Sequence, residues 1–104
     1  MIYNIEFSQE ANNDMQSVFL WIAEEKGMPQ TAMNYASKMK ATIREIAKHP
    51  YSYSIRTLPL SILQYGFDTR RCNFGKYAIL FAIRETEKLI YIHRVIPSAL
   101  LTNG

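Results

Sequence analysis

Three short stretches near the C-terminal end, separated by turn residues, constrain the fold of this chain most. Residues 68–74, 77–84 and 89–96 are rich in β-branched and aromatic side chains, and the sequences NFGK and ETEK separate them. This spacing predicts three antiparallel strands joined by turns. A sheet of this kind needs a second layer over one face, so the rest of the chain must supply that layer.

The N-terminal residues predict a fourth strand followed by a helix. Tyr3, Ile5 and Phe7 alternate with polar residues, which is the pattern of a strand with one buried face. Ser8 can cap a helix that begins directly after it. Apolar residues at helical spacing then extend this helix over about residues 9–26.

A second helix is expected after a short connection. Gly27 suits the left-handed stop of the first helix, and Pro29 suits the first position of the next. Apolar residues keep helical spacing from there until His49 and Pro50 end the run. The two helices therefore form an antiparallel hairpin.

The expected fold is α+β. It combines an N-terminal strand, an antiparallel two-helix hairpin and a three-stranded antiparallel meander in one mainly antiparallel sheet. A chain of 104 residues, 48% of them hydrophobic, fits a single domain over residues 1–104. Residues 51–67 contain Pro59 and Gly66, and we expect a loop of modest order there.

Charge is unevenly distributed along the chain. Residues 1–25 contain five acidic residues and no Lys or Arg, whereas residues 26–104 contain twelve cations against four acids. This asymmetry predicts one electropositive surface, suited to nucleic acid phosphates or to an acidic protein. The lone Cys72 is expected to be a buried thiol in a reducing compartment. No basic leader or long apolar run is present, which predicts a cytoplasmic protein without membrane contact.

Strand alternation predicts the side chains that a partner contacts. If Tyr77, Ile79, Phe81 and Ile83 face the helices, the residues between them form the opposite face of the sheet. We expect an apolar binding surface made of that face, its continuation in the last strand, and two residues off the apolar stripe of the first helix: Leu20, Trp21, Ala78, Leu80, Ala82, Ile90, Ile92 and Ile96. The expected basic rim around it consists of Arg70, Arg71, Lys76, Arg84 and Arg94.

Ordered motifs along nearly the whole chain resemble one known superfamily. These are FS.EA..D at the start of the first helix, A..Y...M...I..I..HP in the second, then GKYAILFAI and IYIHRVIPSA. Their order and the chain length resemble the RelE/ParE toxins of type II toxin–antitoxin modules, which serve in plasmid stabilization. The resemblance implies the fold described above, growth inhibition, and neutralisation by a small acidic antitoxin. ParE-like members inhibit DNA gyrase, whereas RelE-like members cleave mRNA on the ribosome.

The residues favour the ParE branch. The resemblance implies that RelE-like toxins cleave RNA with an Arg in the central strand, an Arg after the last strand and a Tyr near the C-terminus. Here Ala78 follows Tyr77 in the matching strand, and the tail IPSALLTNG contains neither Arg nor Tyr. No catalytic residue is therefore assigned with any strength; His93 and Arg94 are the weak candidates. A structural, hydrogen-bonded imidazole is the more frequent role for a strand histidine such as His93.

The expected function is that of a ParE-like toxin that binds gyrase without its own chemistry. Two alternatives stay open: a RelE-like ribonuclease acting on ribosome-bound mRNA, and a family member that retains only binding. The ribonuclease would use the displaced groups Arg70, Arg71, Lys76, His93 and Arg94. No metal-ligand spacing and no glycine-rich phosphate loop occurs in the sequence, so neither a metal nor a cofactor is expected.

Overall fold

The structure, a computed structural model, describes residues 2–53, 55 and 68–101. Its helices and strands follow the expected order. Their bounds are β1 Asn4–Phe7, α1 Gln9–Leu20, the π-helical turn η1 Trp21–Glu25, α2 Pro29–Lys48, the 3-10 turn η2 Pro50–Ser52, β2 Arg70–Phe74, β3 Tyr77–Arg84, β4 Leu89–Pro97 and the 3-10 turn η4 Ser98–Leu101.

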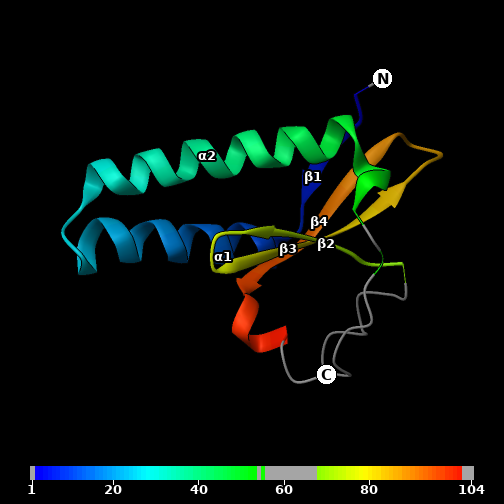
Figure 1. The fold of residues 1–104 in the computed structure, drawn as a ribbon. Coiled ribbons are helices and arrows are strands. Elements are labelled where there is room, and N and C mark those ends of the chain that lie inside the picture. Colours follow the sequence, from blue (N-terminus) through cyan, green and yellow to red (C-terminus); the bar gives the residue numbers. More distant parts are fainter. Residues whose placement is uncertain (1, 54, 56–67, 102–104) are drawn as a thin grey trace.

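The four strands form one sheet in the order β1-β4-β3-β2. The strand β1 pairs with β4 in parallel, and the other two pairs are antiparallel. The hairpin of α1 and α2 lies against one face of the sheet, and η4 lies beyond the end of β4 on the other side (Figure 1). The predicted α+β fold with a mainly antiparallel sheet is confirmed.

The helix ends follow the local chemistry of the sequence. Ser8 Oγ accepts a hydrogen bond from the Ala11 backbone N–H at 2.9 Å and so caps α1. Gly27 has a φ of 62°, which places the turn between the helices in the left-handed region that favours glycine. Pro29 begins α2. The first helix ends in a π-helical turn, Trp21–Glu25, that the sequence pattern did not indicate.

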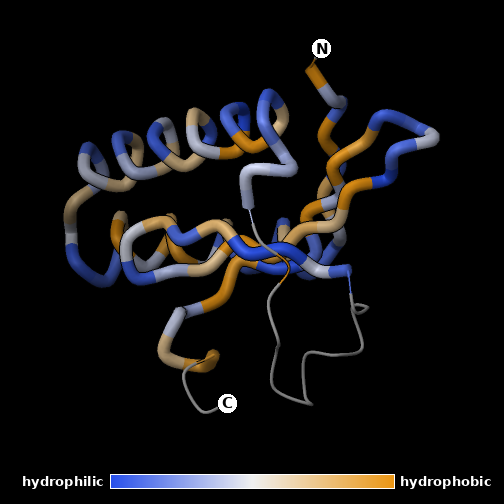
Figure 2. Tube along the Cα trace, turned by 45° about the vertical axis from the view of Figure 1, so that its right-hand side comes forward, coloured by the Kyte–Doolittle hydropathy of each residue, from blue (hydrophilic) through white to orange (hydrophobic). Residues whose placement is uncertain are grey.

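The core lies between the helices and the sheet. The odd-numbered residues Ile79 and Phe81 of β3 are fully buried there, as the alternation predicts. Residues of α2 such as Met39 and Ile43 cover them. Figure 2 shows hydrophilic positions recurring on the side of α2 that is turned away from the sheet. This amphipathic pattern explains why α2 packs on the sheet with one face only.

The prediction for β4 was partly wrong. Ile90 and Ile92 face the helices and belong to the main core, whereas Ile96 lies on the opposite face. The cause is a register shift: Phe81 pairs with Ile92 and Leu80 pairs with Arg94, which leaves His93 as an extra residue in β4. One extra residue reverses the alternation of side chains along the rest of the strand.

The opposite face of the sheet is also partly covered. Ala78, Leu80 and Ile96 form a second buried cluster with Leu101 of η4. The Ser98 backbone N–H donates to the Lys76 carbonyl oxygen at 2.8 Å and ties η4 to the turn between β2 and β3. Cys72 is buried, as expected.

The predicted loop over residues 51–67 lies mostly outside the described residues. Within the described part, Pro50–Ser52 form η2 and Ile55 pairs with Arg70 in an isolated bridge. No helix within the described residues is long and apolar enough to cross a membrane.

Candidate partner-binding groove

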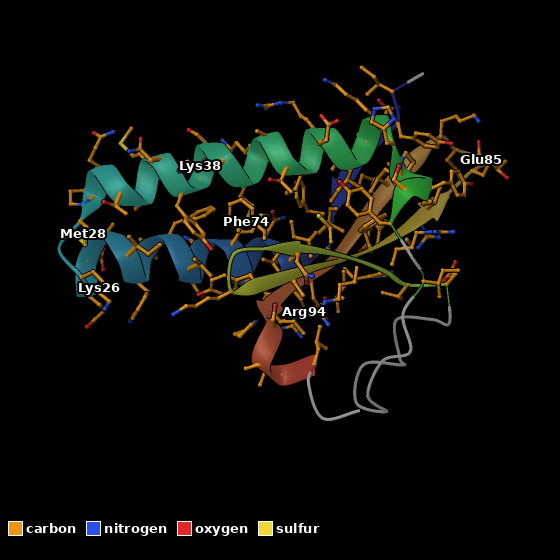
Figure 3. The ribbon with its side chains drawn as sticks, viewed as in Figure 1. Lys26, Met28, Lys38, Phe74, Glu85 and Arg94 are labelled. Carbon is orange, nitrogen blue, oxygen red and sulfur yellow. The ribbon has the colours of Figure 1, made fainter. Side chains whose placement is uncertain are left out.

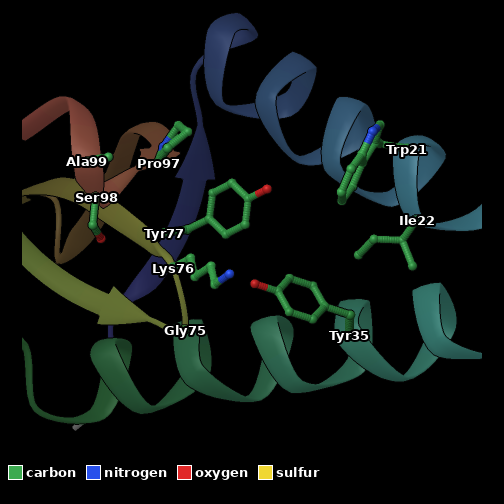
Figure 4. Close-up of a pocket in the computed structure, with 9 residues that line it drawn as sticks. All are labelled: Trp21, Ile22, Tyr35, Gly75, Lys76, Tyr77, Pro97, Ser98 and Ala99. Atoms are coloured by element: carbon green, nitrogen blue, oxygen red, sulfur yellow. The ribbon is translucent and has the colours of Figure 1, made fainter. Parts of the chain in front are cut away.

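An apolar cavity of about 700 Å³ opens between the helical hairpin and one end of the sheet. Trp21 and Ile22 form one wall, Tyr35 of α2 forms another, and Tyr77 stands between them (Figure 4). The cavity is lined by Trp21, Ile22, Tyr35, Gly75, Lys76, Tyr77, Pro97, Ser98 and Ala99. A cavity of this size with few polar groups suits an apolar ligand or an apolar segment of a protein.

Aromatic contacts hold the walls of this cavity in place. The Tyr35 ring packs edge-on against Phe74 at 5.0 Å and against Tyr77 at 6.3 Å between ring centroids. Burial raises the pKa of the Tyr35 phenol, so this hydroxyl stays protonated. Gly75 has a φ of 56°, and a Cβ added there would lie 3.4 Å from the Tyr35 hydroxyl oxygen. Glycine therefore serves both the turn and the close approach of Tyr35.

A second hollow continues the cavity along α1 and β4. It has a volume of about 380 Å³ and shares Trp21, Tyr77 and Pro97 with the first. Its other lining residues are Asp14, Ser17, Val18, Arg94, Val95, Ile96 and Leu100. We call the two hollows together the Trp21 groove. Trp21 is half exposed, with 50% of its surface accessible, so a partner in the groove would bury a large aromatic side chain.

Asp14 binds the part of β4 that extends past β1. Its Oδ2 accepts hydrogen bonds from Arg94 Nε at 2.7 Å and from the Val95 backbone N–H at 2.9 Å, and its Oδ1 accepts one from Arg94 Nη2 at 3.0 Å. Since β1 pairs with β4 only as far as Ile92, the edge of β4 needs other partners there. The Asp14 carboxylate supplies one and also pairs with the Arg94 charge.

The expected basic rim is not one cluster. Lys76 lies in the turn before β3, while Arg84 lies at the far end of β3. Arg70 Nη1 donates to the Tyr53 carbonyl oxygen at 2.6 Å, and Arg71 Nε donates to Asn73 Oδ1 at 2.8 Å. Arg71 and Arg94 share a row across the sheet through Leu80. Lys76 and Arg84 therefore lie at opposite ends of β3, whereas Arg71 and Arg94 lie in one row across the sheet.

The two weak catalytic candidates, His93 and Arg94, make different contacts. His93 packs against Tyr91 with ring centroids 5.1 Å apart, and the Arg84 guanidinium lies 5.2 Å from the centre of the Tyr91 ring. Burial, and then the Arg84 charge, lower the pKa of His93, which keeps the imidazole neutral near pH 7. Arg94 is held by Asp14.

The expected apolar surface is largely unavailable in this structure. Ala78, Leu80, Ala82 and Ile96 are buried on the sheet face away from the helices or at its margin, and Ile90 and Ile92 are buried in the core. Leu20 and Trp21 are exposed, and Trp21 lines the groove. Sequence reasoning missed Asp14, Tyr35, Tyr77 and Pro97, because only the packing of the hairpin against the sheet end brings them together. Among the described residues no cluster of His, Cys, Asp or Glu is placed to hold a metal ion.

Comparison with known proteins agrees with this architecture. The family model described as the ParE toxin of the type II toxin–antitoxin system parDE matches residues 5–99. No curated protein sequence shows significant similarity.

Solved structures of toxin–antitoxin systems share the fold. The chromosomal ParDE system of P. aeruginosa aligns with a TM-score of 0.70 at 12% identity, covering 92% of this chain and 96% of the other. The RelBE2 complex of Mycobacterium tuberculosis aligns with a TM-score of 0.62 at 15% identity, covering 93% and 99%. The intact E. coli RelBE complex aligns with a TM-score of 0.59 at 11% identity, covering 91% and 95%.

The four-stranded sheet with a helical hairpin on one face is the fold of the RelE/ParE superfamily of toxins. The family match extends over nearly the whole chain, and this protein belongs to the ParE toxin family of type II toxin–antitoxin systems.

Proposed function

We propose that this chain inhibits growth by binding DNA gyrase and that an acidic antitoxin neutralises it by filling the Trp21 groove. The observation that carries the proposal is the match to the ParE toxin family over residues 5–99. The structural neighbours are likewise parts of toxin–antitoxin systems. The binding of gyrase follows from the resemblance to ParE-like toxins.

The groove supports an antitoxin partner through its chemistry. An antitoxin segment that folds on binding needs an apolar surface to offset the entropy lost on ordering, and the groove offers Trp21, Tyr77 and Pro97. Lys26 lies 4.9 Å from the centre of the Trp21 ring, and Lys76 lines the other side of the cavity. These cations favour an acidic segment and speed its association.

The positions of the arginines favour a toxin that binds its target over one that cleaves RNA. Cleavage of RNA needs cations aimed at the phosphate and groups that move protons. Ala78 is fully buried where the RelE-like pattern has an Arg, and Arg94 is engaged with Asp14 through two hydrogen bonds. These positions therefore do not provide the cationic site that the ribonuclease would need.

A ribonuclease is the second candidate, because one observation favours it. On the sheet face away from the helices, the Tyr91 ring contacts both Arg84 and His93. A neutral imidazole such as that of His93 can accept a proton. This function would require His93 to act as the base.

Two assays with the purified chain separate the candidates. In a supercoiling assay with gyrase, we expect inhibition that equimolar antitoxin relieves. With ribosomes stalled on mRNA, we expect the message to stay intact. Cleavage at defined codon positions that disappears in His93→Ala, together with full gyrase activity, would replace the gyrase proposal with the ribonuclease.

A further inference from the structure

The helix α2 carries a row of exposed cations. Lys40, Arg44 and Lys48 follow one another at intervals of four residues and are all exposed. This spacing places them on one side of the helix in a row about 12 Å long, since each residue adds ~1.5 Å. We call this row the α2 ridge. The buried face of α2 is made of other residues, among them Met39, Ile43 and Ala47.

Two of the three cations of the α2 ridge have no ion-pair partner among the described residues. Neither Lys40 nor Arg44 forms an ion pair with any residue that the structure describes. Lys48 approaches Glu45 at 3.9 Å, but both side chains are about half exposed. An exposed pair at that distance contributes little, so Lys48 can exchange Glu45 for another anion. The charges of Lys40 and Arg44 are therefore open to an anion from outside the chain.

A concave basic site extends the ridge at its C-terminal end. A hollow of about 520 Å³ is lined by Tyr3, Lys48, His49, Pro50, Tyr51, Ser52 and Lys88. Glu85 accepts hydrogen bonds from Tyr3 at 2.7 Å and from Tyr51 at 2.6 Å and also binds Lys88, so its negative charge is engaged within the protein. Glu45 lies 3.9 Å from both Lys48 and His49 at the border of the hollow. Because the Tyr3 and Tyr51 hydroxyls donate to Glu85, the hydroxyl that the hollow adds beside Lys48 of the ridge is that of Ser52.

We propose that the α2 ridge and the adjoining hollow bind the phosphate backbone of duplex DNA. Duplex DNA carries about one negative charge per 1.7 Å of its axis, so a row of three cations faces several phosphates at once. A convex, open helix face fits against the phosphate backbone of a duplex. Single strands are instead held in grooves where their bases stack on aromatic side chains, so the ridge favours duplex DNA. The ridge is separate from the Trp21 groove, whose lining residues it does not share. This function is additional to gyrase binding and does not depend on it.

Fluorescence anisotropy with a dye-labelled duplex of about 20 base pairs tests the proposal. The full chain is titrated at several salt concentrations, without gyrase or antitoxin. We expect micromolar binding at low salt and a slope of log K against log salt of about −3, for three phosphate contacts. Arg44→Glu should reduce that slope by about one and weaken binding several-fold at every DNA sequence.

Lys26→Glu provides the matched control. It makes the same change in net charge at the turn between the helices, far from the C-terminal half of α2 (Figure 3). We expect it to leave the slope unchanged. Equal losses in the two variants would show attraction by net charge alone and overturn the proposal. Tighter binding of a single strand of the same sequence would overturn the choice of duplex DNA. Circular dichroism confirms that both variants are folded.

Discussion

Two arginines on opposite sides of this molecule illustrate how its surfaces differ. Arg94 lies at the Trp21 groove and donates two hydrogen bonds to Asp14, with 30% of its side chain exposed. Arg44 lies on α2, is exposed, and pairs with no acid among the described residues. In the groove, Asp14 therefore compensates the charge of Arg94, whereas on the helix face the charge of Arg44 stays open.

The number of cations in a region therefore does not identify a binding surface, because a cation that is paired within the fold is not available to a partner. Arg94 stabilises the fold at the groove, because its partner also satisfies the edge of β4. Arg44 does not stabilise the fold through an ion pair and is therefore available to a partner. A compensated, apolar surface suits a protein segment, and an uncompensated cationic surface suits an anionic polymer.

Removing Asp14 should have the largest effect on stability. Asp14→Ala leaves the Arg94 charge and the Val95 N–H without their partner, and we expect a loss of about 3 kcal/mol in the free energy of unfolding. Urea unfolding followed by circular dichroism measures it. Glu24→Ala, an exposed acid of the same hairpin, should cost no more than ~0.5 kcal/mol. Similar costs for both would show that Arg94 is as uncompensated as Arg44.

Trp21 should dominate the affinity of the groove for its partner. Trp21→Ala removes the largest exposed side chain of the groove, and we expect the Kd for the antitoxin to rise about 30-fold, or ~2 kcal/mol. Calorimetric titration gives the Kd. Met33→Ala is the control, because Met33 is 65% exposed and lies outside the lining of the groove. An equal loss in Met33→Ala would place the partner on the exposed face of α2 instead.

Substitutions at two glycines of positive φ distinguish the effect of backbone strain from the effect of the shape of the groove. Gly75→Ala and Gly27→Ala should each destabilise the fold by about 1 kcal/mol, because L-residues disfavour this region. Only at Gly75 would the added Cβ contact the Tyr35 hydroxyl oxygen, at 3.4 Å, since a Cβ at Gly27 has no neighbour within 4 Å. Weaker antitoxin binding in Gly75→Ala alone confirms the role of Tyr35. Equal affinities would remove Tyr35 from the binding surface.

Glu85 should produce the smallest effect, visible only in its pH dependence. Hydrogen bonds from Lys88, Tyr51 and Tyr3 lower its pKa from an ordinary value of 4.5 to about 2. A lowered pKa stabilises the folded state above pH 4.5, and this contribution is lost as the pH falls toward 2. The stability difference between the wild type and Glu85→Gln should therefore shrink over that range. A difference that stays constant over that range would show that these hydrogen bonds do not lower the pKa of Glu85.

The sequence predicted the elements well because their signals are local. The cap at Ser8, the turn at Gly27 and the alternation in β3 each depend on neighbouring residues, and the structure confirms them. The sequence did not predict the extra residue at His93, because a bulge depends on the register of the partner strand. Because of that extra residue, Ile96 lies on the face away from the helices, whereas Ile90 and Ile92, which precede it, lie in the core.

The binding groove was less predictable than the fold. Trp21 was identified because it lies off the apolar stripe of its helix, whereas Tyr35 and Tyr77 had the periodicity of core residues. Pairing between Asp14 and Arg94 joins residues that are 80 positions apart, and no local pattern indicates it. Contacts of this separation arise only when the helical hairpin packs on the sheet.

Hydrogen–deuterium exchange of the free and antitoxin-bound chain tests most directly whether the Trp21 groove is the neutralised surface. We expect slower exchange on binding in Trp21–Glu25, in the turn at Gly75 and Lys76, and in Ser98–Leu101, which together border the groove. The outer face of α2 should keep its exchange rates. Protection confined to α2, or to the sheet face around Tyr91, with the groove unchanged, would contradict the account.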